Sequence, residues 1–252
     1  MTLAIITADD LAPLRHGFFT RKGGASSGVF EGLNCGLGSS DQADMVAINR
    51  ARAAEAMELT PDRLVTVHQV HSADVISVSD VPPGPKPHAD AMVTSRPGLA
   101  LGILTADCQP VLFSDTEAGV IGAAHAGWRG ALGGVLEATL DAMEGLGASR
   151  KDVTAIIGPT ISQAAYEVGP EFFDRFMDDD PDNGRFFAAG HGDRMQFDLP
   201  AYSLARLRAA EIGSAQWTRH CTYRDADHFF SYRRSVHRKE ADYGRLLSAI
   251  RL

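Results

Sequence analysis

Three side chains that can bind a metal ion each follow a β-rich segment of the sequence. They are His71, Cys108 and His125. Residues 99–104 and 120–124 are apolar runs of strand length, so Cys108 and His125 are expected in the turns that follow two strands. Taken singly, each residue is more typical of a protein core. Together, two imidazoles and one thiolate with an open fourth position suit a catalytic zinc ion.

Two other interpretations use the same side chains. In a cysteine hydrolase, Cys108 would be the nucleophile, a histidine the base and Asp107 the orienting group. Neighbouring residues of a strand point to opposite faces, so Asp107 is poorly placed for this unless the turn bends there. A copper oxidase would draw on the same ligand types. However, the nine histidines contain no His-x-His pair, which we expect a multicopper cluster to need.

The residues that follow His125 predict a turn and then a helix. The turn, AGWRG, holds two glycines that permit a tight backbone path. The N-terminus of the helix would direct positive charge at the site. Its apolar positions follow helical spacing, and they are Leu132, Val135, Leu136, Thr139, Leu140 and Met143.

Residues 64–70 and 74–78 are β-rich and surround His71. Strand spacing puts His68 and Val70 on one face, with His71 on the other face or in the turn, so the two histidines are not a helical metal motif. Further along the chain we expect a long loop at 17–38, a helix at 41–57, a strand at 153–157, a short helix at 171–177, a solvated acidic loop at 178–182, and a helix at 199–212 capped by Asp198.

The chain is predicted to form one α+β domain over residues 1–252, an α/β sandwich with packed mixed sheets inside and helices outside. Its 252 residues are 44% hydrophobic and 22% charged, as in ordinary globular proteins with a sizeable core. Many short apolar strands alternate with helices of ordinary length. The stiff segment PPGPKP at 82–87 is expected to be a surface connection and not a linker, since the strands on both sides belong to one sheet system.

The charge balance argues against nucleic acid or an anionic membrane as the main partner. There are 24 basic and 32 acidic side chains, for a net charge of -8. The start lacks a basic region and no apolar stretch is long enough to span a bilayer, so we expect a cytoplasmic protein. We also expect the protein to be a monomer. Three cysteines, Cys35, Cys108 and Cys221, are more typical of reduced thiols than of disulfides.

A small anion such as phosphate would be bound by arginine, because the guanidinium group can form two parallel hydrogen bonds to it. The candidates are Arg21, Arg50, Arg129 and Arg233. For any one of them a surface salt bridge is the more common role. Arg129 is favoured because it lies in the HAGWRG turn.

Several motifs together resemble the laccase-domain family, whose members are regarded as purine nucleoside phosphorylases. The resemblance covers nearly the whole chain, and TADC with HAGWRG is its most specific part. The motifs are HQVHSADV, ADAMVTSRPGLALGILTADCQPVLF, AAHAGWRG, YEVGPEF and FFSYRR. The metal triad of the family carries over onto His71, Cys108 and His125. One position departs from the family pattern, since Thr160 stands where a cysteine is common after Gly-Pro.

The resemblance implies a zinc site in an α/β sandwich, with purine nucleosides and inorganic phosphate as substrates. The implied reactions are phosphorolysis of adenosine, inosine, guanosine and methylthioadenosine to the base and ribose 1-phosphate, and deamination of adenosine. An older label for the family is copper polyphenol oxidase. His68 and Asp107 flank two ligands and are candidates for proton transfer or, preferably, for orienting the ligands. Arg129 is the candidate for holding phosphate.

Two hypotheses from other classes stay open. One is a metal-dependent amidase that edits peptidoglycan precursors, a role to which members of the family are linked. The other is a non-catalytic protein that binds nucleosides in an inherited pocket, against which the retention of all three ligands argues. An amidase would release a free amino acid, whereas a phosphorylase needs phosphate and yields ribose 1-phosphate.

Overall fold

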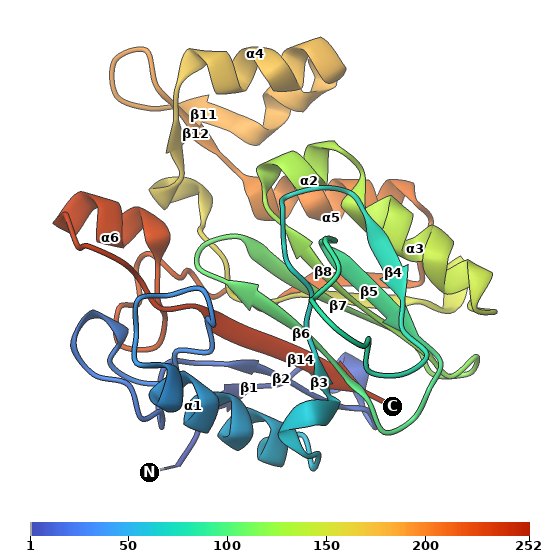
Figure 1. The fold of residues 1–252 in the computed structure, drawn as a ribbon. Coiled ribbons are helices and arrows are strands. Elements are labelled where there is room, and N and C mark those ends of the chain that lie inside the picture. Colours follow the sequence, from blue (N-terminus) through green and yellow to red (C-terminus); the bar gives the residue numbers. More distant parts are fainter. Residues whose placement is uncertain (1) are drawn as a thin grey trace.

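Two large β-sheets form the centre of the computed structural model, which describes residues 2–252 (Figure 1). Both sheets combine parallel and antiparallel pairs. The five-stranded sheet has the order β1 (Ile5–Ile6), β2 (Arg15–Phe19), β14 (Leu246–Arg251), β6 (Ala100–Thr105) and β3 (Leu64–Val65). The six-stranded sheet has the order β13 (Ser214–Trp217), β9 (Thr154–Ile157), β7 (Gln109–Asp115), β8 (Val120–Ala126), β5 (Ala91–Thr94) and β4 (Val75–Ser77).

The two sheets pack face to face because each strand turns alternate apolar side chains toward the other sheet. Leu101 and Ile103 of β6 are fully buried in one cluster with Leu112 of β7 and Ile121 of β8. Ala100, one residue away from Leu101, belongs to a different cluster on the outer face. This period of two is what a strand requires when both of its faces are covered.

Helices cover the outer faces of both sheets, which gives four layers (Figure 1). Helix α1 (Ala43–Ala56) packs on the five-stranded sheet. Helices α3 (Val135–Gly145) and α5 (Leu199–Ala209) pack on the six-stranded sheet, where α3 buries Leu136, Leu140 and Met143 at helical spacing. The predicted α/β sandwich, with mixed sheets inside and helices outside, is therefore confirmed.

A smaller layer projects from the sandwich, at the top of Figure 1. It consists of helix α4 (Pro170–Asp179) and the three-stranded sheet of β10 (Glu167–Val168), β12 (Met195–Phe197) and β11 (Phe187–Ala189). Phe172, Phe176 and Phe197 form its aromatic core, with ring centroids 4.6 to 5.2 Å apart. None of the helices within residues 2–252 is long and apolar enough to cross a membrane.

The remaining elements are short. Helix α2 (Trp128–Leu132) follows β8 directly, and α6 (Tyr232–Arg238) precedes the last strand. Short 3-10 helices lie between the other elements, at Asp9–Leu11, Gly28–Phe30, Pro61–Arg63, Arg150–Asp152, Gln163–Ala165 and Pro181–Phe186.

Several local predictions are confirmed. The helices expected at 41–57 and 171–177 are α1 and α4, and the strand at 153–157 is β9. Asp198 caps α5, since its carboxylate accepts a hydrogen bond from the Ala201 backbone N–H at 3.0 Å. The segment 82–87 connects β4 and β5, which pair in one sheet, so it is not a linker between domains.

Other local predictions are wrong. The strand expected at 64–70 ends at Val65, because the Gln69 side chain takes the place of a neighbouring strand and bonds both the N–H and the C=O of Leu104. The predicted alternation of His68 and Val70 on one strand face therefore does not exist. The single helix expected after AGWRG is two helices, separated at Gly134, which has a φ of +90°.

The sequence analysis also missed strand β7 and misplaced two boundaries. His125 lies inside β8 and not in the following turn. Residues 17–19, expected in the glycine-rich loop, belong to β2. Proline is uncommon in central strands, yet Pro110 is the second residue of β7, and its carbonyl still accepts a hydrogen bond from Gly158 N–H at 2.8 Å.

Candidate metal centre

The three predicted ligands converge although they come from three separate parts of the fold. His71 lies in the connection between β3 and β4, Cys108 in the turn between β6 and β7, and His125 on β8. Their ligand atoms all lie within 4.8 Å of one another, and Cys108 Sγ is 3.9 Å from His71 Nε2. The fold thus assembles, at one edge of the sandwich, the set that the sequence suggested.

Unusual backbone geometry positions two of the three ligands. His71 itself has a φ of +63°, and Asp107, which precedes Cys108, has a φ of +87°. Both values lie in the left-handed region, which is costly for residues with a Cβ and is often found at functional sites. Gly127 contributes space, because a Cβ at this position would lie 3.0 Å from Cys108 Sγ and 3.1 Å from His71 Cδ2.

Asp90 connects two of the ligands, and the sequence analysis did not identify it. Its carboxylate is fully buried, and Oδ1 lies 2.7 Å from His125 Nδ1. The other oxygen, Oδ2, accepts hydrogen bonds from the N–H groups of Val70 and Ser72, which flank His71, at 3.0 and 2.7 Å. A carboxylate only accepts, so Nδ1 of His125 carries the proton and Nε2 is left for a metal ion.

Charges and hydrogen bonds within the site shift the pKa values of Cys108, His125 and Asp90 against the effect of burial. Burial alone would raise the pKa of Cys108, but the imidazoles of His125 and His71 lower it below its usual value. Burial would lower the pKa of His125, whereas Cys108 and Asp90 raise it. Asp90 is held well below its usual pKa, against the effect of burial, by hydrogen bonds from His125 and Ser72. The site therefore favours the thiolate that metal binding requires.

The donor set and its spacing fit a divalent metal ion. Zinc bonds of about 2.0 Å to nitrogen and about 2.3 Å to sulfur place tetrahedral ligands roughly 3.5 Å apart. The 3.9 Å between Cys108 and His71 differs from this by a few tenths of an ångström. Three protein ligands are the number found in catalytic zinc sites, where the fourth position is left for water or substrate. The structure is therefore consistent with a metal cofactor.

Asp107 points away from this centre. Its buried carboxylate accepts hydrogen bonds from Thr222 Oγ1 at 2.6 Å, Ser231 Oγ at 2.9 Å and the N–H of Arg233 at 2.7 Å. Its backbone carbonyl accepts from the hydroxyl of Thr160 at 2.7 Å. Asp107 therefore ties the Cys108 turn to the C-terminal part of the chain. Thr160, which departs from the family pattern, supports the same turn.

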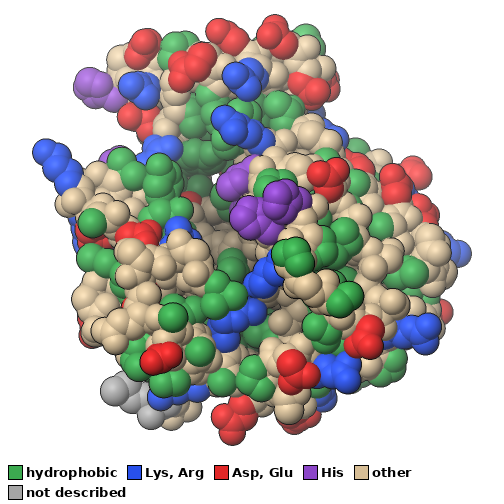
Figure 2. Space-filling model, viewed as in Figure 1, with side chains coloured by type: hydrophobic (Ala, Val, Ile, Leu, Met, Phe, Trp, Pro, Cys, Tyr) green, Lys and Arg blue, Asp and Glu red, His purple; other side chains and the backbone are tan. Residues whose placement is uncertain are grey.

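A cavity of about 310 Å³ opens beside the three ligands. Its apolar part includes Leu37, Val67, Leu104 and Tyr243, and its basic part includes Lys86 and Arg245. Figure 2 shows a hollow on this face of the molecule, with histidine and basic side chains at its edge. The volume lies at the small end of the range for ligand sites, and the mixture of apolar surface with a few polar groups is typical of them.

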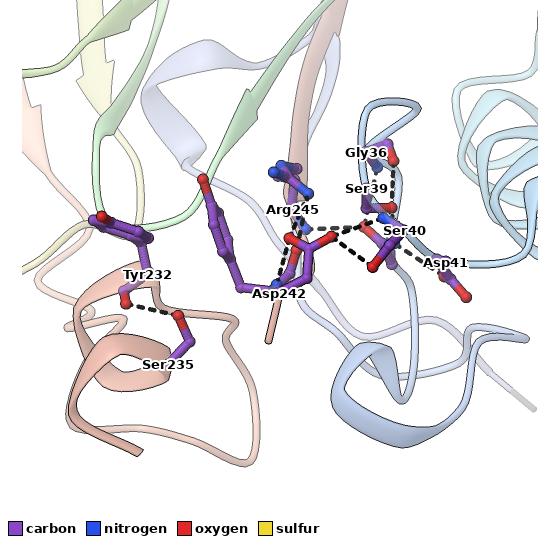
Figure 3. Close-up of polar contacts among 10 residues, drawn as sticks. Gly36, Ser39, Ser40, Asp41, Tyr232, Ser235, Asp242 and Arg245 are labelled. Atoms are coloured by element: carbon purple, nitrogen blue, oxygen red, sulfur yellow. Dashed lines mark hydrogen bonds and ion pairs between the residues drawn. The ribbon is translucent and has the colours of Figure 1, made fainter. Parts of the chain in front are cut away.

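One wall of the cavity is a loop that the C-terminal segment holds in place (Figure 3). Asp242 Oδ2 accepts hydrogen bonds from Ser40 N at 2.7 Å and from Ser40 Oγ at 3.0 Å. The guanidinium group of Arg245 lies over the Tyr243 ring, 4.2 Å from its centroid. These contacts position Leu37, which is 56% exposed at the edge of the cavity.

The other predicted site residues have different positions. His68 lines the cavity and stacks against His88, with ring centroids 4.5 Å apart. Arg129 is exposed, lies over the Trp128 ring and is not among the residues that line the cavity. Arg21 and Arg233 donate to backbone carbonyls of other segments, and Arg50 donates to the hydroxyl of Thr66, which also accepts a hydrogen bond from Lys86.

Two residues of the site were missed by the sequence analysis. Asp90 directly precedes the apolar strand β5. An acidic residue at the end of a strand is only a weak sign that it bonds a metal-binding histidine. Lys86 stands within the proline-rich segment, which looked like a plain surface connection. Only the tertiary fold brings it to the cavity.

Fold and site together define a mixed α/β protein with a His-Cys-His site beside a cavity. The family described as multi-copper polyphenol oxidoreductase laccase matches residues 15–252. The chain belongs to this family, which is the laccase-domain family that the motifs suggested. A purine nucleoside phosphorylase of Deinococcus radiodurans is 39% identical over 93% of this chain and 88% of its own length. Purine nucleoside phosphorylase YfiH of Escherichia coli is 39% identical over 85% of this chain and 86% of its own.

Solved structures agree with this assignment over the whole fold. Protein NMB0706 of Neisseria meningitidis is 33% identical, with a TM-score of 0.89 over 100% of this chain and 99% of that chain. YlmD from Geobacillus stearothermophilus is 31% identical, with a TM-score of 0.86 over 97% of this chain and 93% of its own. The similarity extends over the strands and turns that carry His71, Cys108 and His125.

Proposed function

We propose that this protein is a zinc-dependent purine nucleoside phosphorylase that uses His71, Cys108 and His125 as metal ligands. The observation that carries the proposal is the convergence of these three side chains at a cavity with both an apolar and a basic part. The names of the relatives at about 39% identity support the nucleoside substrate. The proposed nucleoside substrates are adenosine, inosine, guanosine and methylthioadenosine, and the second substrate is inorganic phosphate.

The donor set favours zinc over copper. Two imidazoles and one thiolate match catalytic zinc sites. Within residues 2–252 one group of three histidine, cysteine or acidic side chains has the spacing of a metal site, whereas a multicopper oxidase needs several copper ions. When bound, the metal would supply Lewis acidity toward an oxygen atom of phosphate or water.

Phosphorolysis forms a bond between a phosphate oxygen and C1′ of ribose and breaks the bond from C1′ to the purine nitrogen. The purine leaves with the bonding electron pair and gains a proton, while the sugar passes through a cationic state. The task of the protein is to hold the anion and the nucleoside in line. Tyr243 and Leu37 contribute apolar surface of the cavity for the base, and Lys86 and Arg245 contribute positive charge for phosphate.

We assign different roles to the remaining candidate residues. His68 lines the cavity and is our candidate for proton exchange with the leaving purine. Asp107 is a positioning residue, because all of its side-chain contacts go to the segment around Thr222 and Ser231. Arg129 is not proposed as a phosphate ligand, since it lies outside the cavity lining and over the Trp128 ring.

A panel of purine nucleosides, incubated with and without inorganic phosphate, tests the proposal. We expect free purine and ribose 1-phosphate, formed in equal amounts and only when phosphate is present. Adenosine converted to inosine without phosphate would indicate the deaminase activity that the open fourth ligand position also permits. Release of an amino acid from a peptidoglycan precursor, with no nucleoside turnover, would replace the proposal by the amidase. Oxidation of phenols by a copper-loaded protein would restore the oxidase label.

A further inference from the structure

Two cations converge on one neutral oxygen at the basic side of the cavity. Lys86 Nζ and Arg50 Nη2 both donate a hydrogen bond to Thr66 Oγ1, the arginine at 3.3 Å. Arg50 also donates to the backbone carbonyl of Cys35 at 3.4 Å. Because both groups reach the same hydroxyl, the ammonium and the guanidinium lie within one hydrogen-bonded cluster. Thr66 is 5% exposed, so the cluster is anchored in the interior.

No acidic side chain in the described part of the chain pairs with either of these two cations. Among residues 2–252, neither Lys86 nor Arg50 forms an ion pair with a carboxylate. Burial lowers the pKa of Lys86 to about 8, with a further contribution from Arg50. Although the Lys86 side chain as a whole is accessible, its ammonium lies against buried Thr66. Two adjacent cations without a counter-charge are unfavourable unless an anion joins them.

The cluster has unused hydrogen-bond donors, and Lys86 connects it to the cavity. Arg50 uses two of its five N–H groups, and Lys86 uses one of three. Lys86 lines the same cavity as His71 and Cys108. Arg245 lines it as well and lies next to Gly36, close to the Cys35 carbonyl that Arg50 bonds. The arrangement offers several donors to one oxyanion beside the metal ligands.

Other arginines of the chain are less suited to this role. The guanidinium of Arg21 donates to the backbone carbonyls of Glu31 and Ala226. Arg233 donates to the carbonyl of Glu167, and Arg129 lies over the Trp128 ring and is not among the residues that line the cavity. A second basic group, Lys22 in the glycine-rich loop with Arg21, lines a different cavity that contains none of the metal ligands.

We propose that Lys86 and Arg50, joined through Thr66, form the subsite that binds inorganic phosphate. The oxyanion would replace the Thr66 hydroxyl as the main acceptor of both cations and would balance their charge. This inference rests on the proposed phosphorylase function for its place in the reaction, where the subsite holds the attacking phosphate against the ribose. The binding of phosphate itself can be measured without any turnover.

Binding of inorganic phosphate to the purified full-length protein, measured by calorimetry without nucleoside, tests the subsite. Lys86→Met keeps the length of the side chain and removes its charge, and we expect it to weaken phosphate binding by about tenfold or more. Lys86→Arg restores the charge and should recover most of the affinity. Lys22→Met is the matched control, because it removes the same charge at the other basic cavity and should leave phosphate binding unchanged. Thermal unfolding of each variant checks the fold.

Kinetic measurements with a nucleoside distinguish a failure of the proposed phosphate subsite from a failure of the proposed function. If both proposals hold, Lys86→Met raises the KM for phosphate and leaves the KM for nucleoside nearly unchanged. If phosphate binds and Lys86→Met weakens it, but no ribose 1-phosphate forms, the subsite stands and the phosphorylase proposal fails. If the protein makes ribose 1-phosphate and Lys86→Met binds phosphate normally, the function stands and the subsite is overturned. If Lys22→Met weakens phosphate binding and Lys86→Met does not, phosphate binds at the glycine-rich loop, and the proposed subsite is also overturned.

Discussion

Asp90 and Asp107 are two buried aspartates beside the candidate metal ligands, and they act on different parts of the molecule. Asp90 bonds the imidazole of His125 and the backbone on both sides of His71. Asp107 adjoins Cys108 in sequence, yet its carboxylate bonds Thr222, Ser231 and the N–H of Arg233. Sequence proximity to a ligand is therefore a poor guide to contact with the metal site.

The ionisation of the two carboxyl groups differs in the same way. Burial opposes the charge of both. Hydrogen bonds from His125 and Ser72 overcome this at Asp90 and lower its pKa. At Asp107 burial prevails over the bonds from Thr222 and Arg233, and the pKa is raised. Asp90 is thus the anion that complements the ligand imidazole, whereas Asp107 supports the turn that presents Cys108.

Asp90→Asn should cause the larger loss of metal affinity. An amide has one acceptor oxygen, so its NH2 group would face either the His125 Nδ1–H or the N–H groups of Val70 and Ser72. We expect zinc affinity to fall by about 10- to 100-fold, as for other partners of metal-bound histidines. Competition with a chromogenic chelator measures it. Unchanged affinity in a folded variant would show that Asp90 does not orient His125.

Asp107→Asn should act on stability and much less on the metal. Asparagine keeps one acceptor oxygen, so its NH2 group would face either the Thr222 hydroxyl or the Ser231 hydroxyl and the N–H of Arg233. At least one of these hydrogen bonds is lost or weakened, which costs about 1–3 kcal/mol. For a chain of this length each 1 kcal/mol corresponds to about 2–4 °C in Tm. Calorimetry and the same chelator competition should give a lower Tm with zinc affinity close to wild type. A loss of zinc as large as in Asp90→Asn would remove the distinction drawn between the two aspartates.

A smaller effect is expected from pH at the basic side of the cavity. The pKa of Lys86 is lowered to about 8 by burial and by Arg50, so its ammonium is charged below that pH and neutral above it. Phosphate affinity should therefore fall as the pH rises through about 8, with the fall delayed by the bound anion itself. Lys86→Arg stays charged in this range and should retain its affinity. If the phosphate affinities of the wild-type protein and of Lys86→Arg change in the same way with pH, Lys86 does not contribute its charge to phosphate binding.

The local patterns of the sequence predicted the layers of the fold, and together with the family motifs they selected the three candidate ligands that the structure brings close together. The strand β9, the helix α1 and the cap at Asp198 follow from short-range rules, because their hydrogen bonds lie within the element or its neighbour in sequence. His71, Cys108 and His125 were identified from residue types at strand ends and from family motifs. The structure brings the three together.

The parts that sequence reasoning missed depend on contacts between distant segments. The expected strand at 64–70 is replaced by the bonds of the Gln69 side chain to Leu104, 35 residues away. Asp90 and Lys86 belong to the site only because β4 and β5 lie beside the His71 connection and the cavity. Residue type and spacing do not predict such contacts, because they are made by side chains of distant segments and not by the regular backbone pairing that sequence patterns reflect.

The role of Cys108 is the most direct test of the metal-centred account. Zinc content, nucleoside turnover and intact mass are measured together on the wild-type protein and on Cys108→Ala, with His125→Ala as the parallel ligand variant. We predict that both variants lose bound zinc and turnover together, each by at least about 100-fold, and that the wild-type protein forms no covalent adduct during turnover. A Cys108→Ala protein that keeps its zinc but loses turnover, with an adduct on Cys108 in the wild type, would contradict the account.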